Sequence, residues 1–96
     1  MMILITYDVD VTSQSGASRL RKVAKICENY GVRVQNSVFE LLIDPAQLVV
    51  IKKQLKREII EELDSIRIYH LGKKWQGKIE TIGTQKKIQQ GETLIL

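Results

Sequence analysis

Two acidic residues follow an apolar run near the N-terminus, and their carboxylates are the first groups in the chain that could do chemistry. The run covers residues 4–7, Asp8 comes directly after it, and Asp10 lies two residues further on. A buried strand that ends in a carboxylate can present a metal ligand or a general base. Magnesium needs only one or two carboxylates, because water and substrate phosphate complete its octahedron. The alternative is that both aspartates only terminate the strand, and the spacing fits either interpretation.

Basic residues are the second group of side chains that could do chemistry. Residues 16–33 contain one glutamate and five basic residues, which are Arg19, Arg21, Lys22, Lys25 and Arg33. Residues 73–87 add five lysines against one glutamate, so the excess positive charge lies in two blocks. Such side chains can neutralise phosphates, and arginine can contact them through two parallel hydrogen bonds. The asymmetry indicates a polyanionic partner, although an ordinary solvated surface has the same composition.

Length and composition exclude several other classes of protein. With 96 residues, of which 44% are hydrophobic and 27% charged, the chain predicts one globular domain. The single cysteine, Cys27, and the single histidine, His70, are too few for a zinc site of thiolates and imidazoles. Any metal is then a hard ion, Mg²⁺ or Mn²⁺. We expect a cytoplasmic protein, because one cysteine allows no internal disulfide, and no membrane association, because no apolar run approaches the ~20 residues of a membrane span.

The periodicity of apolar residues predicts the elements that position these groups. A strand over residues 2–8 is apolar on both faces, so we expect it to be central and covered on both sides. A helix over residues 17–30 follows, because Leu20, Val23, Ala24 and Cys27 form one apolar stripe. This stripe places Cys27 in the core and three of the basic residues on the outward arc, with Arg19 towards its edge. Gly31 is expected to end the helix in the left-handed conformation.

The same kinds of sequence signal predict the elements that follow the first helix. Short strands are expected over residues 32–35 and 38–43, with a tight turn or a bulge at Asn36-Ser37 between them. Asp44 and Gln47 have the spacing of a capping box and open a second helix, whose charged, solvated side extends over residues 52–62. A strand over residues 65–71, in which His70 is expected to be packed, completes a β-α-β-β-α-β order. This is the ferredoxin-like α+β arrangement.

The remaining residues form an extension of this core. We expect residues 1–72 to be the ferredoxin-like core and residues 73–96 to lie outside it. Trp75 is expected to anchor the extension, and residues 79–82 are a candidate strand. The apolar ending Leu94-Ile95-Leu96 follows a polar stretch, so we expect it to dock on another surface.

Three separated motifs resemble those of one known family. They are Ile5-Thr6-Tyr7-Asp8-Val9, the helical segment of residues 19–25, and the segment of residues 31–40. In this order they resemble the CRISPR-associated Cas2 family of spacer-acquisition proteins over nearly the full length. Residues 64–72 and the Leu-Ile-Leu ending resemble the variant that accompanies type I-C systems.

The resemblance implies a role for particular positions. Members of this family are ferredoxin-like homodimers, in which the C-terminal extension adds a strand to the partner's sheet. Asp8 matches the magnesium ligand and catalytic carboxylate, which lies near its counterpart across the dimer. The matches to positions implicated in nucleic-acid binding or activity are Arg19, Arg21, Arg33 and Phe39, and Tyr7 and Ser37 are further supporting candidates. Asp10 has no fixed counterpart, so the resemblance assigns it no role.

Two functions follow, and the sequence does not choose between them. The first is a magnesium-dependent endonuclease that hydrolyses RNA or double-stranded DNA, with Asp8 at the metal and the basic residues on the backbone. The second is a non-catalytic DNA-binding bridge in the complex formed with the CRISPR integrase, Cas1, during spacer acquisition. A third interpretation, a generic ferredoxin-like regulatory domain, predicts no salt-dependent binding of DNA.

Overall fold

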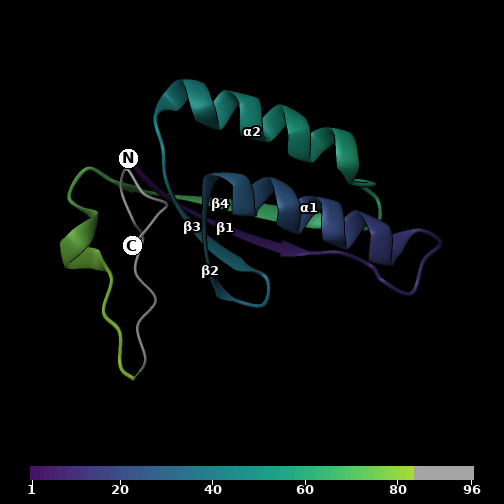
Figure 1. The fold of residues 1–96 in the computed structure, drawn as a ribbon, viewed down its shortest axis with the longest axis horizontal. Coiled ribbons are helices and arrows are strands. Elements are labelled where there is room, and N and C mark those ends of the chain that lie inside the picture. The colour runs from purple at the N-terminus through teal and green to yellow at the C-terminus, as the bar shows by residue number, and fades with distance from the viewer. Residues whose placement is uncertain (84–96) are drawn as a thin grey trace.

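The computed structural model describes residues 1–83, which form a four-stranded antiparallel sheet with two α-helices on one face (Figure 1). In chain order the elements are β1 (Met2–Asp8), α1 (Gly16–Tyr30), β2 (Gly31–Gln35), β3 (Val38–Leu42), α2 (Pro45–Glu58), β4 (Ser65–Gly72) and the short 3₁₀-helix η1 (Trp75–Lys78). The strand order β2-β3-β1-β4 is that of the ferredoxin-like fold. The predicted α+β class and element order are confirmed.

The core lies between the sheet and the helices. In β1, Ile3, Ile5 and Tyr7 point to the helical side, because side chains alternate along a strand. Ile5 is opposite Phe39 of β3 on one side and Ile68 of β4 on the other. The helices close this layer with buried residues that include Val23, Cys27, Leu48, Ile51 and Leu55. Cys27 is a core residue, as predicted.

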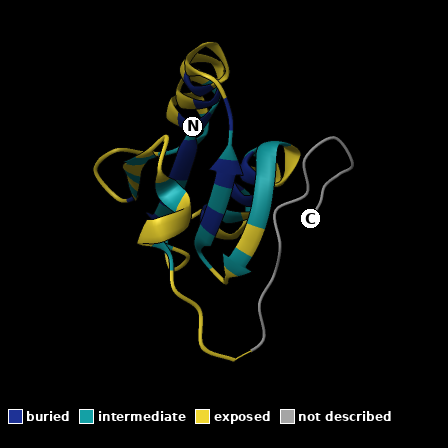
Figure 2. Cartoon of the chain, turned by 90° about the vertical axis from the view of Figure 1, so that its left-hand side faces the viewer, coloured by how far each residue is buried: buried dark blue, intermediate teal, exposed yellow. Residues whose placement is uncertain are grey.

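The opposite face of β1 differs from the prediction. Leu4 and Thr6 point away from both helices and are half-buried, and so are Val38 and Leu42 of the neighbouring β3. Figure 2 shows this alternation of buried and half-buried residues along the strands. The expectation that both faces of β1 are covered holds only in part for residues 1–83: Met2 on this face is fully buried, but Leu4 and Thr6 are not, because both helices pack on the other face. Sequence periodicity records that a face is apolar, but it does not record what covers it.

Gly31 ends α1 for a different reason from the one predicted. Its backbone is extended, with φ −158° and ψ −164°, so the left-handed cap expected there is wrong. A Cβ on Gly31 would lie 2.3 Å from the carbonyl oxygen of Glu40 on β3. Glycine is needed because β2 begins directly at the helix end and lies against the neighbouring strand.

The capping box of α2 is confirmed. Asp44 accepts a hydrogen bond from the backbone N–H of Gln47 (2.7 Å), and the Gln47 side chain accepts one from the backbone N–H of Asp44 (3.0 Å). Pro45 occupies the first helical position, where its missing N–H has no cost. The helix ends at Glu58, before the end of the predicted charged segment.

We expect Asp44→Ala to lower the free energy of unfolding by about 1 kcal/mol, because it removes the acceptor for an N–H at the helix start. Urea denaturation followed by circular dichroism measures this change. Asp44→Asn is the control, because asparagine caps a helix equally well. Equal destabilisation by both variants would show that the cap is not the cause.

The extension is only partly described. Trp75 begins η1 and is half-buried, and residues 79–83 form no strand within the described chain, so the strand predicted at 79–82 is not present in the single chain. Addition of a strand to a partner's sheet stays a prediction, and Leu94-Ile95-Leu96 lies outside the described residues. His70 lies on β4, as expected, but its side chain is exposed rather than packed. Neither α1 nor α2, the two α-helices of residues 1–83, is long and apolar enough to cross a membrane.

Candidate metal and nucleic-acid site

Asp8 is exposed at the last position of β1, the central strand of the sheet. Its backbone is opposite Ser65 of β4, and Thr6 of the same strand is opposite Val38 of β3, so neighbouring strands flank the end of β1 on both sides. Among residues 1–83, no three carboxylate, imidazole or thiolate side chains form a metal-binding group. A single carboxylate nevertheless fits magnesium, because this ion retains several water ligands and binds substrate phosphate.

Asp10 has a structural task in the loop after β1. Its carboxylate accepts hydrogen bonds from the backbone N–H of Thr12 (3.0 Å) and from the Thr12 hydroxyl (2.5 Å). These bonds lower the pKa of Asp10 below its ordinary value. The carboxylate therefore stabilises a local turn, which agrees with the absence of a role for Asp10 in the family resemblance.

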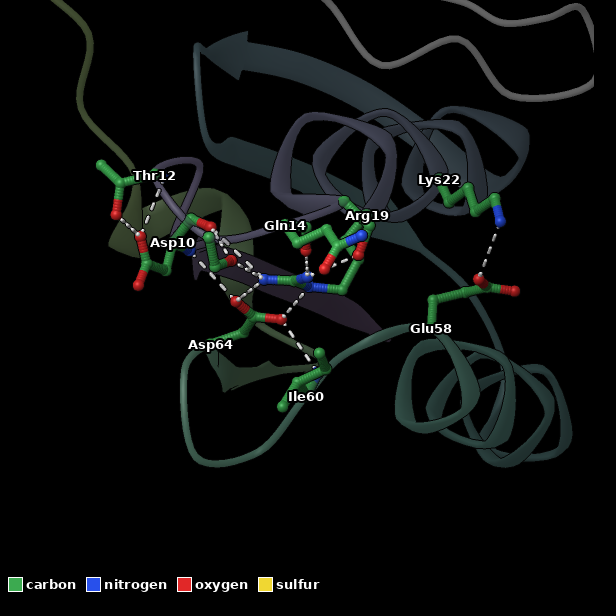
Figure 3. Close-up of polar contacts among 10 residues, drawn as sticks. Asp10, Thr12, Gln14, Arg19, Lys22, Glu58, Ile60 and Asp64 are labelled. Atoms are coloured by element: carbon green, nitrogen blue, oxygen red, sulfur yellow. Dashed lines mark hydrogen bonds and ion pairs between the residues drawn. The ribbon is translucent and has the colours of Figure 1, made fainter.

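The position predicted for Arg19 is wrong. The residue is only 5% exposed, although the helical pattern placed it towards the edge of the outward arc. Its Nε donates to Asp64 Oδ2 (2.8 Å) and its Nη2 to Asp64 Oδ1 (3.2 Å). Further hydrogen bonds reach the carbonyl oxygens of Asp10 and Gln14 and the hydroxyls of Ser13 and Ser15 (Figure 3). All five N–H groups of the guanidinium are occupied, so it has none left for a phosphate.

Asp64 is a residue of this site that the sequence analysis did not identify. It lies directly before β4, its side chain is fully buried, and it pairs with Arg19. It also accepts hydrogen bonds from the backbone N–H groups of Asp10 (3.0 Å) and Ile60 (2.9 Å). The hydrogen bond from Arg19, supported by the two backbone donors, lowers the pKa of Asp64 to about 2. The sequence signals were an acidic residue before a strand and its place at the start of the family-like segment 64–72, and neither indicates a buried ion pair with Arg19.

Three of the predicted basic residues face solvent on α1, and together they form the α1 basic surface: Arg21, Lys22 and Lys25. Lys22 Nζ lies 3.9 Å from Glu58 Oε1 of α2, a partly exposed ion pair that holds the lysine only weakly. The exposure predicted for these three side chains is confirmed. Their binding to nucleic acid stays a prediction.

Arg33, Phe39 and Tyr7 form a layered contact beside the core. The Arg33 guanidinium lies 5.1 Å from the centroid of the Phe39 ring, and that ring stacks on Tyr7 with centroids 6.1 Å apart. Phe39 is fully buried, so in this structure it supports Arg33 and offers no surface to a base. Burial raises the pKa of the Tyr7 hydroxyl, which donates to the carbonyl oxygen of Asn36 (3.4 Å). Ser37 contributes its carbonyl oxygen to the backbone N–H of Tyr7 (3.1 Å).

The fold and these positions define a small ferredoxin-like α+β protein with an exposed carboxylate at the end of its central strand and a basic surface on its first helix. The family described as CRISPR associated protein Cas2 has a model that matches residues 1–79. The chain belongs to this family, as the sequence motifs predicted. Its assignment to the type I-C variant stays a prediction.

Individual relatives agree with this assignment over most or all of the chain. The CRISPR-associated endonuclease Cas2 of Halalkalibacterium halodurans is 53% identical over 95 residues, which are 99% of each chain. The CRISPR-associated endoribonuclease Cas2 of Chlorobaculum tepidum is 48% identical over 96 residues, which are 100% of each chain. A crystal structure of Streptococcus pyogenes Cas2 at pH 6.5 superposes with a TM-score of 0.76 at 55% identity, covering 86% of this chain and 100% of that one.

Proposed function

We propose that this protein is a magnesium-dependent endonuclease that hydrolyses phosphodiester bonds in RNA or double-stranded DNA. The observation that carries the proposal is Asp8, an exposed carboxylate on a strand end that is flanked by paired strands. The relatives named endonuclease and endoribonuclease support the reaction class. We further propose that the activity is cytoplasmic, in keeping with the free thiol of Cys27.

Asp8 would hold the metal, and Mg²⁺ or Mn²⁺ bound there would neutralise the charge that develops on the phosphate. One chain supplies one such carboxylate, so a second copy of the chain would supply the other. The half-buried apolar residues on the uncovered face of the sheet, among them Leu4 and Leu42, support a homodimer in which this face is buried. A two-fold axis then brings the same residue from both protomers to one seam.

The α1 basic surface would bind the phosphate backbone without reading the bases. We expect Arg21→Gln to weaken the binding of RNA and of duplex DNA. The expected decrease in the salt slope of log K is about 0.7–0.9, because one fewer counterion is released. Fluorescence anisotropy at several KCl concentrations, with EDTA present to prevent cleavage, measures this slope.

The matched control is Lys53→Gln, which removes an exposed positive charge from α2 and leaves the α1 basic surface intact. We expect its salt slope to equal that of the unaltered protein. If both variants lose the same slope, net charge and not this surface governs the binding.

The same basic surface also suits a second candidate function, the non-catalytic DNA-binding bridge to the CRISPR integrase, Cas1. The three exposed side chains favour it as much as they favour cleavage, because both functions need a phosphate-binding surface. Incubation of the purified protein with labelled RNA and duplex DNA, in Mg²⁺ or in EDTA, separates the candidates. Cleavage that requires Mg²⁺ supports the endonuclease, whereas salt-dependent binding without cleavage of either substrate supports the non-catalytic bridge.

A further inference from the structure

The buried ion pair of Arg19 and Asp64 joins three segments that are distant in the sequence. Arg19 lies in the first turn of α1, and Asp64 lies 45 residues later, directly before β4. The guanidinium also holds the loop of residues 9–15, through Asp10, Ser13, Gln14 and Ser15 (Figure 3). This loop is the one that leaves the sheet at Asp8.

Asp64 is connected to two backbone segments next to Asp8, one on the neighbouring strand and one in the loop that follows. Its chain neighbour Ser65 is the residue opposite Asp8 in the sheet. Its Oδ1 accepts the backbone N–H of Asp10, two residues after Asp8, at 3.0 Å. The strand position beside Asp8 and the chain that follows Asp8 are therefore tied to one buried carboxylate.

The loop has two backbone features that restrict which residues it can contain. Ser15 has φ 64° and ψ 9°, a left-handed conformation that few residues other than glycine adopt, and its hydroxyl accepts a hydrogen bond from Arg19 Nη1 (3.0 Å). A Cβ on the next residue, Gly16, would lie 2.2 Å from the carbonyl oxygen of Asp10. Within residues 1–83, every buried side-chain nitrogen and oxygen has a hydrogen-bond partner.

We propose that Arg19 and Asp64 are positioning residues for Asp8, and that Arg19 does not contact nucleic acid. The inference rests on the proposed endonuclease function, because it concerns the carboxylate assigned to the metal. All five N–H groups of the guanidinium form hydrogen bonds inside the protein. Arg19 can therefore affect catalysis only indirectly, by fixing the position of the loop that follows Asp8. Substitution of Arg19 or Asp64 then impairs catalysis while phosphate binding is retained.

The test compares Asp64→Asn and Arg19→Lys with the unaltered protein in three measurements. These are kcat and KM for cleavage at saturating Mg²⁺, the Kd for the same nucleic acid in EDTA, and the Kd for Mn²⁺ from electron paramagnetic resonance of the free protein. We expect kcat to fall about 10- to 100-fold and Mn²⁺ to bind about tenfold more weakly, as for groups that orient a metal ligand. The Kd for nucleic acid is expected to stay within about twofold, because no phosphate contact is lost.

The matched control is Glu58→Gln, which breaks the partly exposed ion pair between Lys22 of α1 and Glu58 of α2. We expect it to leave kcat and the Mn²⁺ affinity unchanged, and to leave the Kd for nucleic acid unchanged or slightly tighter, because it removes one negative charge beside the α1 basic surface. Ser13→Ala is the mild variant for the case in which Asp64→Asn does not fold, because it removes one acceptor of Arg19 and the hydrogen bond that the Ser13 hydroxyl donates to the carbonyl oxygen of Asp10, and leaves the buried ion pair in place. It is expected to lower kcat with the nucleic-acid Kd unchanged.

Three results would overturn the proposal. If Asp64→Asn tightens nucleic-acid binding, Arg19 is a phosphate ligand that Asp64 holds back. If the folded variants keep kcat and the Mn²⁺ affinity while Asp8→Asn loses cleavage, the endonuclease stands and the positioning role is wrong. Cleavage by Asp8→Asn at the unaltered rate instead rejects the endonuclease assignment, and the positioning role with it.

Discussion

Asp8→Asn is expected to lower the kcat of magnesium-dependent cleavage by about 10²-fold, equivalent to about 3 kcal/mol of lost charge stabilisation at the metal. Asparagine has nearly the same shape, and Asp8 is exposed, so the fold should tolerate the change. Binding of nucleic acid in EDTA should be unchanged or slightly tighter, because one negative charge is removed from the surface. Single-turnover cleavage of RNA and duplex DNA at a fixed Mg²⁺ concentration measures the effect.

Asp44→Asn is the matched control for this experiment. Asp44 is also an exposed aspartate shortly after a strand, but it lies at the other end of the sheet, where β1 begins next to Ile43. We expect it to cleave like the unaltered protein. If Asp8→Asn and Asp44→Asn cleave equally well, Asp8 is not the metal ligand, and the bridge to the integrase becomes the better assignment.

The largest expected effect on stability belongs to Asp64→Ala. Removal of the carboxylate leaves the Arg19 guanidinium buried without its counter-charge. It also leaves the backbone N–H groups of Asp10 and Ile60 without their acceptor. We expect the free energy of unfolding to fall by about 3 kcal/mol, as when one partner of a buried ion pair is lost. Urea denaturation at pH 7 measures this change, and Glu58→Gln, which breaks a partly exposed ion pair, is expected to lose less than about 1 kcal/mol.

The same carboxylate predicts a pH dependence of stability. The pKa of Asp64 is about 2 in the folded chain, whereas the pKa of an unfolded aspartate is about 3.9. The group therefore stabilises the fold fully above about pH 4, and this contribution is lost as the pH falls towards 2. The denaturation midpoint of the unaltered protein should fall in this range more steeply than that of Asp64→Ala. Parallel curves would show that another group controls the acid transition.

Local patterns predicted much of this protein correctly. The order of helices and strands, the α+β class, the capping box of Asp44 and Gln47 and the exposure of the α1 basic surface each depend on neighbouring residues along the chain. Apolar spacing and helix-capping chemistry act within a few residues, so they can be recognised without knowledge of the fold. The placement of Asp8 at the end of the central strand also followed from this local information.

The contacts that surround Asp8 depend on the tertiary structure. Arg19 is buried because it pairs with the carboxylate of Asp64, 45 residues later in the chain. The spacing of apolar residues within one helix gives no information about so distant a partner. Gly31 is required by the approach of β3, and one face of the sheet stays free of helices because both pack on the other. Local propensity can therefore place a charged residue on a helix, but only the packing of distant segments decides whether its charge faces solvent or a buried partner.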